Sequence, residues 1–323
     1  MARLLREQGW RVTVVWPPAD PPRWRYRIGL GPLWLSRAAA RAAGALGPVQ
    51  LIVTNVFLGA GFPSNIPRVH VYHGTMVRHS VSIRRWLPRR ELVRRVLGGG
   101  VSDALSARGA TIVCVSSSTA AEVRRFYGVK ADAVVPNAVD TTVFRPIPRA
   151  DARARLGLPA DVRLALFVGR PDPGKGIDLL PAATWRAGYD LAVAGPGRLP
   201  GARHLGVLSP PQLALAYCAA DCVVLPSSYE ACSFVVLEAL ACGAPLITTR
   251  VGWMNDLLRE YPAYDALCVQ PNEEEIVDRL TRLSALADPK MLHQVRDWVA
   301  EHHNLDTYAA RWSELLTSLT GTM

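Results

Sequence analysis

The amino-acid sequence predicts an α/β protein made of two doubly wound domains that follow one another along the chain. The first observation is the length, because 323 residues suit two domains of this class better than one. The second is that short apolar runs alternate with segments of helical periodicity, as in buried parallel strands connected by helices. The third is a stretch rich in proline and charge at 145–163, which divides the alternation into two halves.

The first half predicts a domain over residues 1–147. Residues 1–8 have the pattern of the end of a helix, Gly9 stops it, and 11–16 have the pattern of a strand. Because a parallel sheet usually starts with a strand, we expect this domain to lack its first strand. Buried strands are then predicted at 49–55, 69–72, 110–116 and 132–136, with helices at 36–46, 84–97 and 118–127.

The second half predicts a domain over residues 148–303. Strands are predicted at 163–169, 190–195, 221–226 and 245–249, and helices at 176–186, 210–219, 234–242, 273–286 and 291–302. A last helix within 304–323 could cross back to the first domain. Two such domains form a cleft between the carboxyl ends of their sheets, where ligands bind, so an enzyme is the default expectation.

The charge of the chain is uneven. Of 37 Lys and Arg and 27 Asp and Glu, residues 1–148 contain 21 and 7, a net charge of +14, whereas residues 149–323 contain 16 and 20, a net charge of −4. A basic first half suggests an anionic partner, either phosphate, a membrane surface or nucleic acid. The alternative is a drift in composition combined with solvated helix faces.

The six cysteines have no spacing that is typical of zinc sites, so we predict no bound metal. Most lie in apolar runs, where a free thiol behaves as a small hydrophobe, and this favours a reducing cytoplasm. The opening residues carry charge where a signal peptide needs an apolar core. No apolar run reaches the roughly 18 residues that a membrane span needs. We therefore expect a cytoplasmic protein.

The strongest chemical pattern is SSYEACSFVVLEALACG at 227–243. It predicts a polar loop after a strand, then an apolar helix that starts near Ser233 or Phe234, with Ser233 as a possible cap. The N–H groups at a helix start suit a phosphate or a sugar oxygen. Glu230 in the loop and Glu238 in the helix could accept hydrogen bonds from vicinal hydroxyls of a sugar or ribose. The alternative is a loop acid and a buried structural acid.

A second pattern is FVGRPDPGKG at 167–176, in which a strand is followed by Gly169 and a loop. Arg170 and Lys175 are paired cations at a strand end, which suits a diphosphate. The alternative is a surface loop with two solvated cations. The segment does not match the GxxxxGK[ST] phosphate loop.

Two weaker patterns accompany these. VPNAVDTTVF at 135–144 contains Asn137 and Asp140, which are common turn residues and could form a plain inter-domain turn. His73, followed by Gly74, lies at the carboxyl end of a predicted strand, where it could contact a substrate hydroxyl or act as a general acid or base. A structural histidine is the alternative.

Together these patterns resemble family 4 of the retaining glycosyltransferases, which have the two-domain GT-B fold. The family's G-R-x4-K-G segment corresponds to 169–176, its E-x7-E block running into E-A-x-A-x-G-x-P corresponds to 230–245, and its P-N-G-V-D-x3-F segment corresponds to 136–144. The resemblance covers essentially residues 1–320. It implies transfer of a sugar from a nucleotide sugar, of the UDP or GDP type, with retention at the anomeric carbon and without metal or cofactor.

The resemblance also implies roles for individual residues. Arg170 and Lys175 would bind the donor diphosphate, Glu238 the ribose, and Glu230 the donor sugar. His73 would contact the sugar from the first domain, and residues 206–208 would line the base pocket. The implied catalytic residues are His73 and Glu230, and the implied donor-binding residues are Gly169, Arg170, Lys175, Gly206, Val207, Leu208, Ser233, Phe234, Val235 and Glu238.

The sequence departs from the family pattern at three places. Ala231-Cys232-Ser233 stands where G-F-G is common, and Gly252-Trp253 stands where Gly-Gly is frequent, which predicts a narrower sugar or acceptor pocket. The family's first strand and its Gly-rich loop are not seen. A non-catalytic nucleotide-sugar-binding protein is therefore one alternative, and phosphorolysis or sucrose- or trehalose-type synthesis on the same fold is another.

Residues 81–97 form a basic amphipathic segment in which Pro88 would start or kink a helix. Such a segment suits an anionic membrane surface and a lipid-linked acceptor. The alternatives are a solvated helix packed on the domain and a site for a soluble anionic acceptor. Nucleic acid is not expected, because no recognition motif accompanies the charge. The residues of interest are Arg84, Arg85, Trp86, Arg89 and Arg90.

Overall fold

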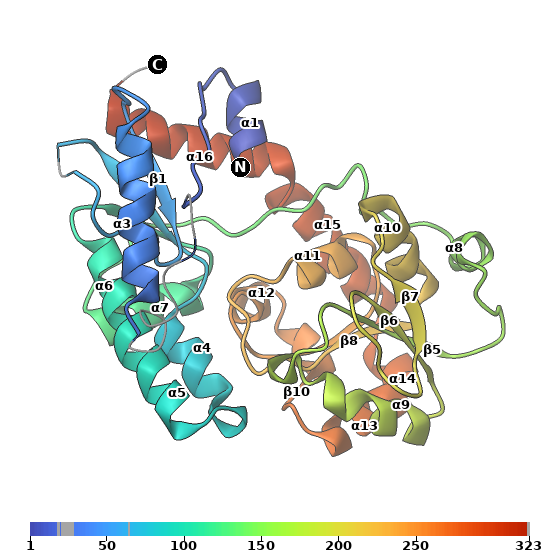
Figure 1. Cartoon of the computed structure of the whole chain (residues 1–323). Coiled ribbons are helices and arrows are strands. Elements are labelled where there is room, and N and C mark those ends of the chain that lie inside the picture. The colour runs from blue at the N-terminus through green and yellow to red at the C-terminus, as the bar shows by residue number, and fades with distance from the viewer. Residues whose placement is uncertain (18–19, 21–28, 64, 322–323) are drawn as a thin grey trace. The chain divides into compact units, whose positions relative to one another are not determined.

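The computed structural model describes residues 1–17, 20, 29–63 and 65–321. Its internal contacts divide the chain into two compact units, which are described separately (Figure 1). Unit 1 consists of Met1–Pro136 and Tyr308–Met323, and unit 2 consists of Asn137–Thr307. Each unit contains a parallel β-sheet whose strands are connected by helices, so the predicted α/β class is confirmed.

The described strands of unit 1 form a parallel sheet in the order β1-β2-β3-β4. The inner strands β2 and β3 are almost entirely buried, as expected for parallel strands covered by helices, whereas the edge strands β1 and β4 are only partly buried. The strands are β1 (Ile52–Asn55), β2 (Arg68–Tyr72), β3 (Thr111–Cys114) and β4 (Ala133–Val134). The helices are α1 (Ala2–Glu7), α3 (Gly31–Gly44), α4 (Met76–Ser82), α5 (Arg89–Arg94), α6 (Gly100–Ala107), α7 (Ser117–Tyr127) and the part of α16 (Leu305–Thr320) that follows Thr307, with helical turns η1 (Arg84–Trp86) and η2 (Arg95–Gly99).

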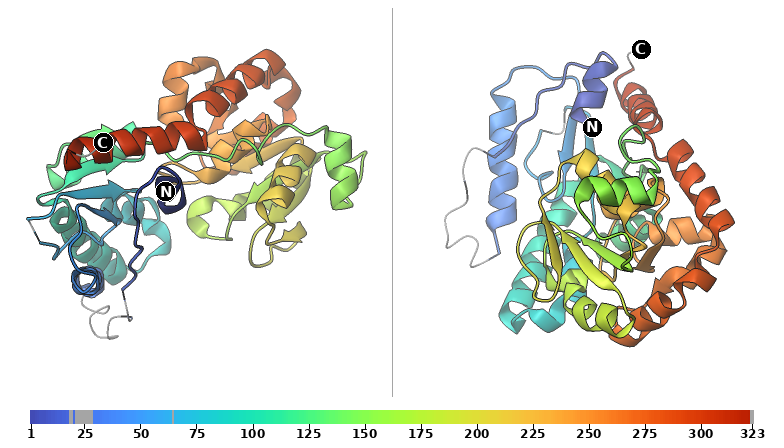
Figure 2. Two further views of the ribbon diagram at one scale, coloured as in Figure 1. Left: turned by 90° about the horizontal axis from the view of Figure 1, so that it is seen from above. Right: turned by 90° about the vertical axis from the view of Figure 1, so that its right-hand side faces the viewer.

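The predicted strand at 11–16 is wrong, because the structure has no strand there. The Val12 carbonyl accepts hydrogen bonds from the Arg6 guanidinium at 2.8 and 3.1 Å instead of joining a ladder. Val14 and Trp16 are exposed, so no sheet covers these side chains. Figures 1 and 2 show α1 beside α16, and Trp10 Nε1 donates to Ser313 Oγ at 3.5 Å between the two segments.

The predicted helix at 84–97 is instead a turn followed by a longer helical segment. Pro88 separates η1 from α5 as the N-cap residue of α5, which agrees with its predicted effect. From Arg89 the segment continues through the π-helical turn η2 into α6. Glycines allow this close packing, because a Cβ added at Gly100 would lie 2.9 Å from the Val77 side chain.

Unit 2 contains a six-stranded parallel sheet in the order β10-β9-β8-β5-β6-β7. The strands are β5 (Leu164–Val168), β6 (Asp190–Ala194), β7 (Arg203–Gly206), β8 (Cys222–Leu225), β9 (Leu246–Thr249) and β10 (Cys268–Val269). The helices are α8 (Arg149–Leu156), α9 (Leu180–Arg186), α10 (Pro210–Ala219), α11 (Phe234–Ala241), α12 (Met254–Glu260), α13 (Glu273–Thr281), α14 (Leu283–Leu286) and α15 (Pro289–His302), with the turns η3 (Pro173–Lys175), η4 (Ile177–Leu179) and η5 (Pro262–Leu267).

The contacts divide the chain after Pro136, whereas the sequence places the boundary after 147. The segment between these positions is bound to unit 2. Asn137 Nδ2 donates to the Cys232 carbonyl at 2.7 Å, and Val139 N donates to the His303 carbonyl at 2.8 Å. The ring of Phe144 lies 6.1 Å from that of Tyr217.

Candidate functional site

The strand order of unit 2 defines one switch point, between β5 and β8. The chain first adds β6 and β7 on one side of β5, then returns to add β8 on the other side. In open α/β sheets, ligands bind beyond the carboxyl ends of the strands at such a point. The loops that leave these two ends are 169–176 and 226–233, which contain the two strongest sequence patterns.

The two loops are bonded to each other through their backbones. Ser228 N donates to the Gly174 carbonyl at 2.8 Å. Gly176 has φ of +67°, and a Cβ added there would lie 2.5 Å from the carbonyl oxygen of Pro226. A side chain at this position would therefore force the loops apart, which explains the glycine that follows Lys175.

The paired loops bring Lys175 and Glu230 together. Lys175 Nζ lies 2.5 Å from Glu230 Oε1, and Ser227 Oγ donates to the same oxygen at 2.9 Å. The Ser227 carbonyl accepts a hydrogen bond from Thr249 Oγ1 at 2.6 Å, which fixes Ser227 to β9. The Glu230 side chain is only 14% exposed, so the ammonium group compensates a largely desolvated carboxylate. Sequence reasoning missed the supporting role of Ser227.

The start of α11 completes this edge of the sheet. Ser233 occupies the N-cap position, as predicted, but its side chain makes no capping hydrogen bond. The first-turn N–H groups therefore lack the usual side-chain acceptor, and the positive end of the helix dipole lies beside them. Phe234 is 55% exposed and Val235 is partly buried, so the first turn of this otherwise apolar helix reaches the surface.

Glu238 lies one helical turn further along α11 and has a defined partner. Tyr217 on α10 donates its hydroxyl to Glu238 Oε2 at 2.7 Å. Burial raises the pKa of Glu238 to about 7, and the Tyr217 hydrogen bond opposes this rise because it favours the carboxylate. The sequence left Glu238 as either a hydroxyl-binding acid or a buried structural acid, and it did not identify Tyr217 as its partner.

Three glycines meet at the carboxyl ends of β5, β6 and β7. Gly195 N donates to the Gly206 carbonyl at 2.8 Å, and Gly169 N donates to the Ala194 carbonyl at 2.9 Å. Gly195 has φ of +149°, and a Cβ added there would lie 2.1 Å from the Gly169 carbonyl oxygen. Gly195 was not predicted as a site residue, although the Gly-Pro-Gly that follows a buried strand is a usable signal. Val207 and Arg170, nearby in sequence, are exposed.

Two family models match the chain. The model described as Glycosyltransferase Family 4 matches residues 1–143, and the model described as Glycosyl transferases group 1 matches residues 163–285.

The chain belongs to glycosyltransferase family 4.

Its relatives include proteins named D-inositol 3-phosphate glycosyltransferase. The protein from Segniliparus rotundus is 36% identical over 214 residues, which are 58% of this chain and 46% of the relative. The protein from Acidothermus cellulolyticus is 33% identical over 226 residues, which are 60% of this chain and 49% of the relative. The family 4 chain thus spans about half the length of the curated relatives that it matches.

Similar solved structures show the GT-B fold that the sequence predicts. A sucrose-phosphate synthase from Thermosynechococcus elongatus has a TM-score of 0.79 and 24% identity, with 99% of this chain and 92% of that chain covered. HepE from Anabaena, in complex with UDP-glucose, has a TM-score of 0.71 and 18% identity, with 98% and 88% covered.

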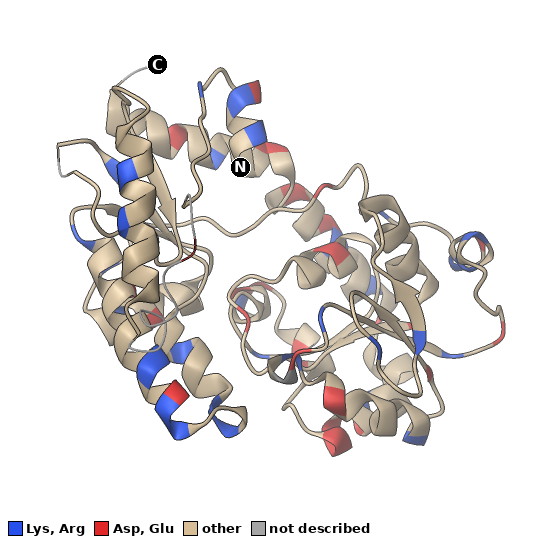
Figure 3. Ribbon diagram, in the orientation of Figure 1, with Lys and Arg blue, Asp and Glu red and all other residues tan. Residues whose placement is uncertain are grey.

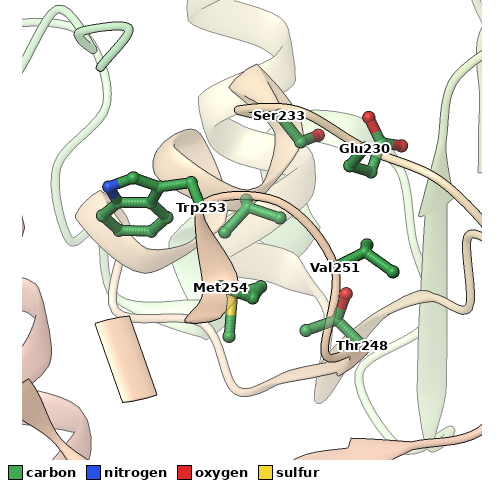
Figure 4. A pocket seen from close by; sticks show the side chains of 7 residues that line it. Glu230, Ser233, Thr248, Val251, Trp253 and Met254 are labelled. Carbon is green, nitrogen blue, oxygen red and sulfur yellow. The ribbon is translucent and has the colours of Figure 1, made fainter. Parts of the chain in front are cut away.

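A small pocket with room for about one water molecule lies beside Glu230 in the family 4 chain. It is lined by Glu230, Ser233, Val236, Thr248, Val251, Trp253 and Met254 (Figure 4). Figure 4 shows the Trp253 ring turned away from Glu230. The ring is buried against His303 and Trp298, with ring centroids at 4.8 and 6.0 Å, so His303 and Trp298 fix its position at this pocket.

Gly252 has a separate role in the same loop. It has φ of +56°, and a Cβ added there would lie 2.2 Å from the Glu230 carbonyl oxygen. The next residue, Trp253, donates its backbone N–H to the Ala231 carbonyl at 2.8 Å. The glycine of the Gly-Trp pair is therefore required for the close approach of the loop after β9 to the Glu230 loop.

In unit 1, His73 follows the end of β2, as predicted. Its Nε2 lies 3.0 Å from Asn55 Oδ1, and because this oxygen only accepts, the proton is on Nε2 and Nδ1 is left as an acceptor. The His73 ring reaches solvent, yet the protein around it lowers its pKa by desolvation. Val56, directly after Asn55, has φ of +56°, which is rare for a β-branched residue. Sequence reasoning missed Asn55.

The predicted basic segment of unit 1 places several Arg residues close together (Figure 3). Some of them are exposed, together with neighbouring apolar side chains. We define the α5–α6 ridge as Arg89, Arg90, Val93, Leu97 and Val101. Both arginines are exposed, and the apolar residues, spaced four apart, are 55%, 63% and 57% exposed. Residues four apart lie on one face of a helix.

The other charged residues of this segment have partners. Arg85 lies 3.9 Å from the centroid of the Trp86 ring, and Arg84 donates to the Val81 carbonyl at 3.3 Å. Glu91 accepts hydrogen bonds from Arg94 and Arg95, which lower the pKa of Glu91 to about 2. The cations that remain for a ligand are therefore mainly at the start of α5.

Within the described ranges, no group of three or more His, Cys, Asp or Glu side chains is arranged to hold a metal ion. All six cysteines are buried free thiols. Of the helices that the structure describes, none combines the length and the apolar character that crossing a bilayer requires.

Proposed function

We propose that this chain transfers a sugar from a nucleoside-diphosphate sugar, of the UDP or GDP type, to an acceptor, with retention at the anomeric carbon. The observation that carries the proposal is the contact between Lys175 and Glu230 at the β5–β8 switch point. It joins a cation suited to phosphate with a carboxylate suited to sugar hydroxyls. The names of the relatives and the UDP-glucose bound to HepE support a nucleotide sugar as the donor.

The glycines would receive the diphosphate. Gly169 and Gly195 have no side chains where the backbones of β5 and β6 approach each other, so a diphosphate could come close to the backbone at this edge. Arg170 and Lys175 would neutralise the charge, and the start of α11 at Ser233, Phe234 and Val235 would add backbone donors. Gly206, Val207 and Leu208, after β7, would contact the base.

Transfer with retention would use the leaving phosphate as the base. Departure and attack would occur on the same face of the sugar. The bond from the anomeric carbon to the diphosphate oxygen would break, the acceptor oxygen would bond to that carbon, and the acceptor proton would pass to the diphosphate, which leaves as the nucleoside diphosphate. Glu230 would hold the sugar hydroxyls, and His73 Nδ1 would accept from another hydroxyl. We propose that this needs neither metal nor cofactor, because Arg170 and Lys175 supply the positive charge.

A panel of UDP-, GDP-, ADP- and dTDP-sugars tests the proposal. We expect calorimetry to detect binding of at least one donor. We also expect proton NMR of the product to show the transferred sugar in the same anomeric configuration that it has in the donor. Binding without transfer to any acceptor would favour a non-catalytic nucleotide-sugar-binding protein. The absence of binding to every donor would refute the proposed function.

We further propose that the α5–α6 ridge docks on an anionic membrane surface, so that the protein acts peripherally at the cytoplasmic face with a lipid-linked acceptor. The exposure of Val93, Leu97 and Val101 favours membrane docking over a purely solvated helix, because exposing a row of apolar side chains to water is unfavourable. Arg89 and Arg90 would contact lipid phosphates, and Arg84, Arg85 and Trp86 would lie at the interface.

Flotation with vesicles of phosphatidylglycerol, compared with phosphatidylcholine, tests the ridge. At about 1 kcal/mol for each Arg near an anionic surface, Arg89→Ser with Arg90→Ser should lower the partition coefficient roughly thirtyfold. The matched control is Arg124→Ser with Arg125→Ser, which removes the same charge from exposed positions on α7. Equal flotation of the two double variants would contradict the docking proposal.

A further inference from the structure

The side chain of Glu238 is held from inside the protein by one buried hydroxyl. Glu238 belongs to α11, whose other inward residues are apolar and buried. Tyr217, on the neighbouring helix α10, is 0% exposed and donates to Glu238 Oε2 at 2.7 Å. The Glu238 carboxyl group itself is only partly buried. Oε2 is therefore bound to the interior, and Oε1 is the oxygen that a ligand could contact.

The ring of Tyr217 is fixed by its surroundings. Phe144 packs edge-on against it with ring centroids 6.1 Å apart, and Phe144 is itself buried. Phe144 N donates to the Asp140 carbonyl at 2.8 Å, which ties the aromatic ring to the turn at 136–144. A buried tyrosine has only two side-chain torsions, so this packing leaves its hydroxyl little freedom to follow another acceptor.

We propose that Tyr217 is a positioning residue for ribose recognition, because it binds Glu238 Oε2 and so directs Oε1 to a ribose hydroxyl of the nucleotide. The proposal rests on the proposed function and on the ribose-binding role of Glu238 that the family resemblance implies. A carboxylate that accepts one hydrogen bond from the protein keeps free lone pairs on the other oxygen. A carboxyl group without this donor would rotate, or would take up a proton and lose acceptor capacity.

A purely structural role for Tyr217 makes a different prediction. If the hydroxyl only satisfies a buried polar group, its removal should lower stability and weaken every nucleotide to the same extent. If it positions Glu238, its removal should mainly reduce the preference for ribose over deoxyribose. The ratio of affinities therefore separates the two roles, because it cancels effects that are common to both ligands.

The experiment compares UDP with 2′-deoxy-UDP and 3′-deoxy-UDP by calorimetry, and runs GDP with its deoxy forms in parallel. For Tyr217→Phe we expect UDP binding to weaken roughly tenfold, the size of a hydrogen bond to a charged group, while binding of the deoxy form that lacks the recognised hydroxyl changes less than about twofold. The control is Tyr264→Phe, which deletes another fully buried hydroxyl of unit 2, one that accepts a hydrogen bond from Leu246 N at 3.2 Å.

A double-mutant cycle with Glu238→Gln makes the test decisive. If Tyr217 acts through Glu238, the combined variant should bind UDP no more weakly than Glu238→Gln alone. Additive losses, or equal weakening of UDP and both deoxy forms by Tyr217→Phe, would overturn the proposal. If Glu238→Gln keeps the wild-type preference for UDP over its deoxy forms, the proposal is also overturned. This outcome can be measured even if the tyrosine variant does not fold. A wild-type protein that binds no nucleoside diphosphate would refute the proposed function as well, whereas the other outcomes leave it standing.

Discussion

Replacing Lys175 with Ala tests the site where the structure is most specific. The Lys175 ammonium group contacts Glu230 Oε1 at 2.5 Å, and the loop that carries it is fixed by the hydrogen bond from Ser228 N to the Gly174 carbonyl. Lys175→Ala removes the cation but leaves the backbone path of the loop available. We expect weaker binding of the donor diphosphate with little change in fold.

The structure sets the magnitude of this loss. A hydrogen bond to a charged group contributes about 1.5–3 kcal/mol. Lys175 already pairs with Glu230. The free energy of diphosphate binding therefore includes only the difference between the interaction of Lys175 with the diphosphate and its interaction with Glu230. We therefore expect the lower half of this range, about 1.5–2 kcal/mol, or roughly a 10- to 30-fold weaker affinity for UDP. Because the lysine side chain is about a third exposed, the free energy of unfolding should fall by at most about 1 kcal/mol.

Calorimetry with UDP, UMP and uridine separates the diphosphate contact from other effects. Lys175→Ala should weaken UDP most and leave uridine unchanged. Arg186→Ala is the control, because Arg186 is a cation of unit 2 that pairs with Glu273 and Glu274 outside the site. An equal loss for UDP and uridine, or an unchanged affinity for UDP, would refute the assignment of Lys175 to the diphosphate.

Three further substitutions test other parts of the structure. Gly195→Ala should lower the free energy of unfolding by about 2–4 kcal/mol, because its Cβ would overlap a carbonyl oxygen, whereas Gly188→Ala, where nothing lies within 4 Å, should cost about 1 kcal/mol in urea unfolding. Asn55→Ala should lower kcat several-fold with unchanged UDP affinity, since it removes the partner that orients His73; a loss of UDP affinity alone would contradict this. Burial raises the pKa of Glu238 from 4.5 to about 7, so the native state binds a proton more tightly than the unfolded state does. The free energy of unfolding should therefore fall as pH rises from about 4.5 to 7. Glu238→Gln should remove about 1–3 kcal/mol of this fall, measured by urea unfolding at about pH 5 and pH 8.

The strands of unit 2 that could be predicted are those with almost all residues buried on both faces. β5, β6, β8 and β9 are near-continuous apolar runs, which no solvent-facing strand would have. β7 was missed because Arg203–Gly206 is an edge strand with polar and exposed residues. β10 was missed because a strand of two residues is too short to show an alternation of apolar and polar residues. The false strand at 11–16 has apolar residues without a sheet to cover them. α8 was missed because its charges were attributed to a linker.

The segments that form the site could be predicted from the sequence, but the contacts between these segments could not. Lys175 and Glu230 were each identified from their local pattern, yet β6 and β7 separate their loops in the sequence. Their contact depends on β8 pairing with β5, which is a property of the strand order and not of either segment. Tyr217 is hidden for another reason, because its helix is apolar and a tyrosine there is typical of a core.

The turn at 136–144 acquires a new interpretation from these contacts. The sequence left it as a possible inter-domain turn, but Asn137 Nδ2 donates to the carbonyl of Cys232, between Glu230 and Ser233, and Phe144 supports Tyr217. The segment therefore supports both carboxylates from the protein side. If so, Asn137→Ala should weaken UDP-glucose about fivefold, the size of one buried neutral hydrogen bond, and weaken uridine less.

Asn272→Ala provides the comparison for this variant. Asn272 also makes a side-chain hydrogen bond in unit 2, as the cap that accepts from Glu275 N at 2.9 Å, but on α13 rather than beside Glu230. It should lower stability without changing the ratio of UDP-glucose to uridine affinity. If both asparagine variants change this ratio equally, the turn contributes only to stability. If only Asn137→Ala changes the ratio of UDP-glucose to uridine affinity, the loop that contains Glu230 depends on the turn for its position. The variant removes the hydrogen bond from Asn137 Nδ2 to the Cys232 carbonyl, which connects the turn to this loop.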